Sequence, residues 1–234
     1  MSIRAEHLNH IYGEGTAFEQ YALKDVSFEI EDGQFIGLIG HTGSGKSTLL
    51  KIVSGALNQT SGRVVVDQRK VQLLTLGTGF DFELSAKENV YLNGAIIGYS
   101  KAFIDEHYQE IVDFAELEGF MEEKVKNFSS GMVSRLGFSI ATVAGAAEIL
   151  ILDDSLSAVD AKTEHAIIDN LKHTRKNKTT IITAHRLSAV VHADLILVMQ
   201  DGRIIERGRH DDLLAQGGWY AKTYESQQLE MEGG

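Results

Sequence analysis

The sequence predicts an α/β fold built on a mainly parallel β-sheet, and two observations carry that prediction. An apolar segment at 34–39 runs directly into a glycine-rich loop, after which a helical pattern extends from Lys46 to about Leu57. Residues 148–152 and 179–183 are short apolar runs, as expected of parallel strands that are buried on both faces. A strand, a loop and a helix followed by further buried strands is the pattern of an α/β domain.

Two further parts complete the expected architecture. Residues 3–12 and 22–30 are strand-like and precede the first parallel strand, so we expect an antiparallel β part at the N-terminal end. In the middle of the chain Ser100 has the position of a helix N-cap, and apolar residues follow on one face between 104 and 115. This pattern predicts an amphipathic helix within an inserted helical subdomain.

The domain organisation follows from these parts. The chain has 234 residues, 43% of them hydrophobic, which is enough for one full core and a small appended subdomain. We expect residues 1–86 and 145–234 to form the main α/β core, which includes the glycine-rich loop, with its antiparallel β part. Residues 87–144 are expected to form the helical subdomain.

Composition excludes several classes of protein. Lysine and arginine number 22 against 33 aspartate and glutamate, a net charge of −11, and no long basic cluster occurs, so a nucleic-acid partner is disfavoured. The absence of cysteine excludes disulfides and thiolate chemistry. No apolar run approaches the roughly 18–20 residues that span a bilayer. We therefore expect a cytoplasmic protein, peripheral at the inner membrane face if it docks on a membrane protein.

The glycine-rich loop carries the strongest chemical signal. It satisfies the pattern GxxxxGK[ST] and lies between a predicted strand and a predicted helix. Glycines allow main-chain N–H groups to surround phosphate, the helix N-terminus adds its dipole, Lys46 reaches the outer phosphates and Ser47 ligates Mg²⁺. A merely flexible loop does not explain Lys-Ser at a helix start. The predicted binding residues are Gly40, His41, Thr42, Gly43, Ser44, Gly45, Lys46, Ser47 and Thr48.

A second acidic motif follows the apolar run at 149–152. Asp153 ends this run 107 residues after Lys46, on what is expected to be a neighbouring strand. A carboxylate at the carboxyl end of a strand can hold Mg²⁺ through water. Asp154 follows at the place of a base for the attacking water. Alone this motif is weak, because buried strands that end in aspartate are common.

The order of the motifs along the chain is more specific than any one of them. Residues 127–132 read Asn-Phe-Ser-Ser-Gly-Met before a helix, and Ser130 precedes Asp153 by 23 residues. After Asp153 come Ser-Ala-Val-Asp at 157–160 and His185 beyond a strand. This order resembles that of the ATP-binding cassette (ABC) ATPases over nearly the whole chain. The resemblance implies a P-loop NTPase (RecA-like) core, ATP and Mg²⁺ as ligands, and ATPase activity.

The resemblance also implies an ATP-dependent, head-to-tail homodimer. Phe-Ser-Ser-Gly-Met at 128–132 matches the family signature Leu-Ser-Gly-Gly-Gln, with Ser129 at the family serine and Ser130 at the first glycine. Ser129, Ser130 and Gly131 are then expected to contact the γ-phosphate across the dimer interface. A helix N-terminus with small residues can present free N–H donors to an anion. Without the other motifs, a plain helix cap would explain these residues.

Three further residues take roles by the same resemblance. Asp160 ends the D-loop, which communicates between the two sites, and His185 is the switch histidine that contacts the γ-phosphate. Tyr12 resembles the aromatic residue that stacks on adenine, although Tyr21 and plain core packing are alternatives.

Two departures from the family pattern bear on turnover. The glutamine expected after the next strand has no clear match, because Gln72 lies too early and residues 75–77 occupy the expected place. Asp154 stands where most active members carry glutamate, which withdraws the carboxylate by about one C–C bond, ~1.5 Å. A misplacement of about 1 Å can lower a rate about 10²-fold. We therefore expect ATP binding with low hydrolysis.

The subfamily resemblance changes along the chain. Residues from about 1 to 57 resemble the ATPases of energy-coupling-factor importers, and residues from about 60 to 143 resemble teichoic-acid and polysaccharide exporter ATPases. From about 146 to 230, including Gly-Trp-Tyr at 218–220, the chain resembles the ATPase half of a multidrug exporter. Three blocks of this kind favour an engineered chimera over a divergent natural protein.

Three functions are compatible with these observations. The first is a cassette subunit that powers a membrane permease. The second is a soluble, non-transport ABC ATPase, although such proteins usually carry two cassettes and a nucleic-acid or ribosome arm. The third is a folded nucleotide-binding chimera with no transport partner. The substrate, the permease and the direction of transport are not encoded in these motifs.

Overall fold

The computed structural model describes residues 2–74, 79–143, 147–154, 156 and 160–232. Contacts group the chain into two compact units. The first comprises residues 1–73, 148–153 and 176–234, and the second comprises residues 74–147 and 154–175. The second unit includes the helix after residue 160, because that helix packs on the helix that ends at Val143.

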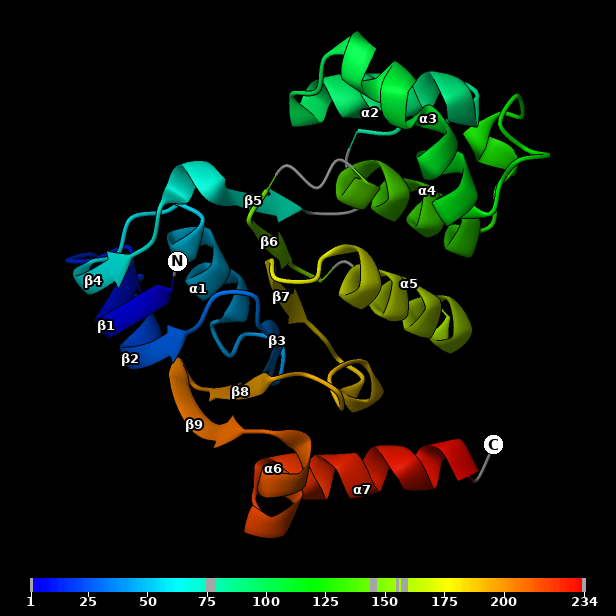
Figure 1. The fold of residues 1–234 in the computed structure, drawn as a ribbon. Helices are drawn as coiled ribbons and strands as arrows, with labels where there is room; N and C mark the ends of the chain where they lie inside the picture. Colours follow the sequence, from blue (N-terminus) through cyan, green and yellow to red (C-terminus); the bar gives the residue numbers. More distant parts are fainter. Residues whose placement is uncertain (1, 75–78, 144–146, 155, 157–159, 233–234) are drawn as a thin grey trace. The chain divides into compact units, whose positions relative to one another are not determined.

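A six-stranded sheet forms the centre of the first unit, in the order β5-β6-β7-β3-β8-β9 (Figure 1). β3 pairs in parallel with β7 and β8, β6 pairs in parallel with β7, and β8 and β9 are antiparallel. Every residue of β3, β6 and β7 is buried, as their apolar sequences predict. The bounds are β3 Phe35–Ile39, β5 Val71–Leu74, β6 Ile149–Leu152, β7 Thr179–Thr183, β8 Leu195–Gln200 and β9 Arg203–Gly208.

The predicted N-terminal antiparallel part is a second sheet of three strands, in the order β2-β1-β4. Its strands are β1 Ile3–Tyr12, β2 Gln20–Ile30 and β4 Ser61–Val65, and β1 is antiparallel to both neighbours. Alternate residues of β1 and β2 face the core, where they join β3, β8 and helix α1 in one hydrophobic cluster. The predicted α/β architecture is confirmed.

Helix α1, Lys46–Val53, is shorter than the sequence pattern predicts. It ends before Leu57 because Gly55 adopts a left-handed conformation with φ 79°, which a continuing helix cannot contain. The main chain of Leu57 instead donates to the carbonyl of Lys51, so the end of the apolar pattern closes a turn.

The second unit is helical and has its own core. Ser100 accepts a hydrogen bond from the N–H of Phe103, which confirms the predicted N-cap, and Ser85 with Glu88 forms a capping box. Apolar side chains of α2, α3 and α4 pack together between these helices. Its helices are α2 Ala86–Ile97, α3 Lys101–Ala115, α4 Ser130–Val143 and α5 Ala161–Thr174.

The C-terminal part of the first unit consists of two helices that follow β9, α6 His210–Gln216 and α7 Trp219–Glu232 (Figure 1). The described residues also form three short 3₁₀ turns: η1 Gln68–Lys70, η2 Val125–Asn127 and η3 Leu187–Ala189. In the described ranges, no helix is both long and apolar enough to cross a membrane.

Candidate functional site

The glycine-rich loop joins the end of β3 to the start of α1, and its backbone is shaped by glycine. Gly40 has φ 144°, and a Cβ atom there would lie 2.1 Å from the main-chain oxygen of Met199. Gly43 has φ 81°, a left-handed conformation, with open space around it. The loop therefore follows a path that other residues cannot adopt at position 40, and it ends at the N-terminus of a helix, where free N–H groups attract anions.

Lys46 is folded into this loop and is only 8% exposed. Its ammonium donates to the main-chain oxygens of Gly40 at 2.8 Å and His41 at 2.9 Å, and to the Ser44 hydroxyl at 3.3 Å. These partners hold the cation at the loop itself. A polyphosphate bound in the loop would therefore meet a positive charge that is already positioned.

Ser47 and Asp153, the two candidate magnesium ligands, lie next to each other. The Ser47 hydroxyl donates to Asp153 Oδ1 at 3.1 Å, and the Thr183 hydroxyl lies 3.4 Å from the same oxygen. Mg²⁺ prefers oxygen ligands and is usually held by one or two carboxylates with waters and phosphate oxygens. Among the described residues no cluster of three or more His, Cys, Asp or Glu side chains could hold a metal. The hydroxyl and the single carboxylate present here fit Mg²⁺ bound jointly with a phosphate.

Tyr12 lies at the end of β1 beside the first turn of α1. Its hydroxyl is hydrogen-bonded to the hydroxyl of Thr48 at 3.2 Å, and its ring stands edge-on to His10 with centroids 4.5 Å apart. The side chain is 40% exposed, which argues against plain core packing. Tyr21 on the neighbouring strand is 53% exposed and stays an alternative adenine contact.

His185 follows β7, at the same edge of the sheet as the loop after β3. β3, β6 and β7 are parallel, so the residues after their carboxyl ends gather at one edge, where α/β proteins bind ligands. The N–H of Ala184 donates to the oxygen of Leu38 at 3.4 Å, which ties the start of this segment to β3. Asp154, next to Asp153, has a left-handed backbone with φ 52°.

The signature residues and Asp160 lie together within the helical unit. Ser129 precedes α4, and its hydroxyl accepts from the main-chain N–H three residues on. A methyl group at Gly131 would lie 3.3 Å from Asp160 Oδ2, so the carboxylate is next to this glycine. Hydrogen bonds from the hydroxyl and the N–H of Thr163 lower the pKa of Asp160, which caps α5.

Residues 23–157, more than half of the chain, match the family model described as ABC transporter. The chain belongs to this family. It is an ATP-binding cassette, the ATPase part of such transporters, as the order of motifs predicts.

Curated relatives of the cassette include exporters of two kinds. It is 42% identical over 240 residues to the probable multidrug resistance ABC transporter ATP-binding/permease protein YheI of Bacillus subtilis (strain 168), covering 95% of this chain. It is 33% identical over 195 residues to the O-antigen export system ATP-binding protein RfbB of Klebsiella pneumoniae, covering 82% of this chain and 79% of that protein. The chain spans 40% of the length of YheI and of a Legionella pneumophila ATP-dependent lipid A-core flippase.

Solved structures agree with the fold of the cassette. The dimeric post-hydrolysis state of the ATP-binding cassette MJ0796 bound to ADP and Pi has a TM-score of 0.75 at 25% identity, covering 89% of this chain and 98% of that one. A bacterial Atm1-family ABC exporter with ATP bound has a TM-score of 0.79 at 26% identity, covering 97% of this chain and 42% of that one.

Two parts of the sequence prediction lie outside the described residues of the cassette. They are the segment 75–77, at the place of the expected glutamine, and residues 157–159 before Asp160. Two residues that the sequence analysis did not assign to the site contact the predicted loops. Trp219 bonds to the His41 side chain and Gln227 to the main chain of His185. Only the fold reveals these contacts, because the partners are 178 and 42 residues apart.

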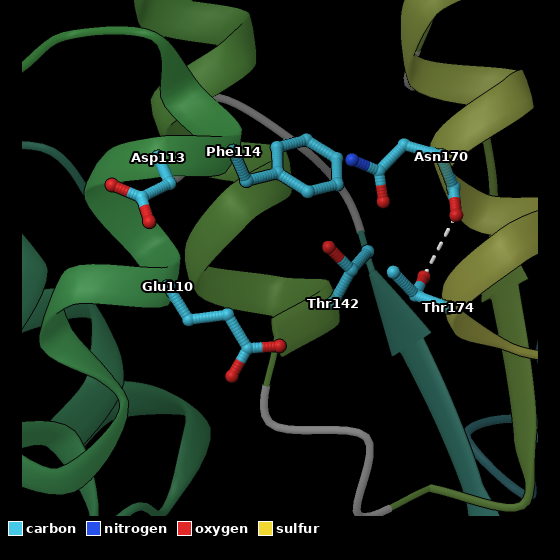
Figure 2. Close-up of a pocket in the computed structure, with 6 residues that line it drawn as sticks. All are labelled: Glu110, Asp113, Phe114, Thr142, Asn170 and Thr174. Atoms are coloured by element: carbon cyan, nitrogen blue, oxygen red, sulfur yellow. Dashed lines mark hydrogen bonds between the residues drawn. The ribbon is translucent and has the colours of Figure 1, made fainter.

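The helical unit of the cassette also holds a pocket of about 270 Å³ (Figure 2). Carboxylates of Glu110 and Asp113 line it beside the ring of Phe114, and none of the described lining residues is basic. Because carboxylates repel phosphate, this pocket does not suit a nucleotide. The glycine-rich loop at residues 40–47, called the phosphate loop from here on, is therefore the better candidate for the ATP site. The remaining lining residues are Thr142, Asn170 and Thr174.

Proposed function

We propose that this cassette binds Mg-ATP on the phosphate loop, dimerises head to tail around two ATP molecules and hydrolyses them slowly to drive a membrane permease. One observation carries the proposal. The loop that holds Lys46 and the hydrogen-bonded pair Ser47–Asp153 lie together at one edge of the sheet. These groups offer a cation, a hydroxyl and a carboxylate where a helix N-terminus begins.

Each group has a defined task in this proposal. Lys46 binds the outer phosphate oxygens, and the ring of Tyr12 stacks on adenine. Ser47 and Asp153 hold Mg²⁺, which when bound neutralises charge on the phosphates. Asp154 accepts a proton from the attacking water, and His185 contacts the γ-phosphate. The short side chain of Asp154 limits the rate, because the carboxylate falls short of the water it must orient.

The second chain completes the site. Ser129, Ser130 and Gly131 of one copy face the γ-phosphate bound by the other, where the start of α4 offers N–H donors to the anion. Support comes from the cassette MJ0796, which was solved as a dimer with ADP and Pi. The relative YheI is an ATP-binding/permease protein, which supports a permease as the membrane partner. In this proposal the cassette lies at the cytoplasmic face of the membrane.

Light scattering with and without Mg-ATP tests the central claim. Turnover is suppressed with Asp154→Asn, since asparagine also tolerates the left-handed backbone at this position. We expect the mass to double on addition of Mg-ATP, and the same variant carrying Lys46→Ala to stay monomeric. An identical mass with and without Mg-ATP, at concentrations that saturate binding, would refute the ATP-dependent dimer. Recovery of the chain with membranes separates the permease-bound cassette from a chimera without a transport partner.

A further inference from the structure

The first residue of α7 contacts the phosphate loop through its side chain. The indole Nε1 of Trp219 donates to His41 Nε2 at 3.3 Å, and the two rings stand edge to face with centroids 5.3 Å apart. Trp219 is the only tryptophan in the chain. An indole can only donate, so the accepting nitrogen of His41 carries no proton in this arrangement. The contact thereby selects one tautomer and one orientation of the His41 ring.

The start of α7 is itself fixed by β9. The carboxylate of Glu206 accepts hydrogen bonds from the main-chain N–H groups of Trp219 and Tyr220. A negative charge at a helix N-terminus is favourable, because it meets the dipole and the unpaired N–H groups. Gly218 leaves room for this carboxylate, since a Cβ atom there would lie 2.2 Å from Glu206 Oε1. Trp219 is therefore presented to the loop from a fixed base.

Further along the same helix, Gln227 holds the segment around His185. Its Oε1 accepts from the N–H of Leu187 at 2.8 Å, and its Nε2 donates to the carbonyl of His185 at 2.9 Å. Both ends of one side-chain amide thus bond to main-chain groups two residues apart. Trp219 and Gln227 are eight residues apart, about 12 Å along a helix at ~1.5 Å per residue. One rigid element therefore contacts both the loop after β3 and the segment after β7.

We propose that α7 is a brace for the nucleotide site, in which Trp219 and Gln227 are positioning residues for the two histidine-bearing loops. The inference rests on the proposed function, because it assigns the two loops to one bound ATP. Trp219 sets the orientation of the His41 ring, and Gln227 sets the main chain that carries His185. Neither residue touches the reacting atoms. The brace acts by holding both loops in position around the nucleotide. A displacement of about 1 Å of a group at the site can lower a rate by up to about 10²-fold.

A pair of adjacent glutamines gives a matched test. Gln227→Glu keeps the acceptor for Leu187 but replaces the donor with an oxygen that faces the carbonyl of His185. Gln228→Glu makes the same change in charge at a neighbour whose side chain has no hydrogen bond in the described part of the chain. We expect Gln227→Glu to lower ATP turnover about tenfold or more with ATP Kd changed less than about twofold. We expect Gln228→Glu to match the wild type in both.

Two measurements keep this test decisive if Gln227→Glu loses stability. Gln227→Ala removes both bonds without adding charge, and its melting temperature is recorded beside its turnover. A rate lowered at assay temperatures well below melting, with Kd preserved, supports the brace. Equal turnover of Gln227→Ala, Gln227→Glu and Gln228→Glu overturns it. Lys46→Ala tests ATP binding separately. If the Gln227 variants keep normal turnover while Lys46→Ala loses ATP binding, the brace is refuted and the proposed function still stands.

The tryptophan end has its own readout. Tryptophan emission comes from Trp219 alone, since the chain has no second tryptophan, and it responds to the surroundings of an indole that is bonded to His41. We expect ATP to change this emission in the wild type and not in Lys46→Ala. Trp219→Phe keeps the ring contact and removes the donor, so a double-mutant cycle with His41→Ala is expected to show coupling in ATP Kd. Additive effects in that cycle, or emission that ignores bound ATP, would overturn the role of Trp219.

Discussion

The Ser47 hydroxyl donates a hydrogen bond to Asp153 Oδ1 at 3.1 Å, although the two residues lie 106 positions apart in the chain. The bond joins the first turn of α1 to the residue after β6. It sets a neutral oxygen and a charged oxygen side by side at the edge of a buried parallel sheet. Mg²⁺ accepts ligands of both kinds, so the pair defines where the metal of Mg-ATP would be held.

Asp153→Asn should remove the contribution of Mg²⁺ to ATP binding. The amide oxygen can still accept from Ser47, but the negative charge that attracts the metal is gone. We expect ATP Kd with Mg²⁺ to rise toward the value measured in EDTA, by calorimetric titration under both conditions. Asp211→Asn, an exposed change in the first turn of α6, serves as the control and should keep the full Mg²⁺ effect. An intact Mg²⁺ effect in Asp153→Asn would contradict the assignment.

Lys46→Ala should abolish tight ATP binding. The change removes the charge directed at the outer phosphates and also the three hydrogen bonds that the ammonium makes within the loop. We expect ATP Kd to rise about 10²-fold or more, about 2.7 kcal/mol. Circular dichroism checks that the fold is kept. Affinity equal to that of the wild type would show that the loop is not the nucleotide site.

Asp154→Glu should raise the hydrolysis rate with little change in ATP Kd. The added methylene extends the carboxylate by about 1.5 Å toward the water, while ground-state binding depends on Lys46, Ser47 and Asp153. The left-handed backbone at Asp154 suits aspartate better than glutamate, so we also expect a somewhat lower melting temperature. Single- and multiple-turnover assays make the comparison. Equal or slower hydrolysis at unchanged Kd would show that side-chain length is not the limiting defect.

His10→Phe should stabilise the first unit. His10 is only 7% exposed, and neither ring nitrogen has a hydrogen-bond partner among the described residues. An unsatisfied buried polar group costs about 1–3 kcal/mol, whereas phenylalanine keeps the edge-on contact with Tyr12. We expect the free energy of unfolding to rise by about 1 kcal/mol in denaturant titration. If phenylalanine is too large for the site of His10, His10→Leu tests the same point with a smaller apolar side chain. A loss of stability in both variants would contradict the prediction.

Local sequence patterns predicted those features that depend on local physics. The strand, loop and helix around Lys46 follow from glycine and apolar spacing, and the cap at Ser100 follows from residue type. The predicted end of α1 was wrong by a few residues, because the left-handed backbone at Gly55 ends the helix although the apolar pattern continues to Leu57. A periodic pattern shows which residues face a core and not where the helix ends.

Features that depend on distant partners could not be predicted. Nothing local to Gln227 indicates that its amide bonds to the main chain at His185 and Leu187, because only the fold brings α7 to that segment. Nothing near Asp154 signals a positive φ, since aspartate occurs in every kind of turn. The three-block mosaic stays a prediction, which separate alignment of each third against cassette sequences would test.

The two glycines at the ends of the first half of the phosphate loop differ in what they would tolerate. At Gly40 the carbonyl of Met199 occupies the space of a side chain, so no replacement fits without moving β8. At Gly43 the surroundings are open and only the backbone angle is restrictive, which asparagine can adopt at modest cost. Substitutions in this loop are therefore tolerated at position 43 and excluded at position 40. A random library selected for folding alone would therefore retain asparagine as well as glycine at position 43, but only glycine at position 40.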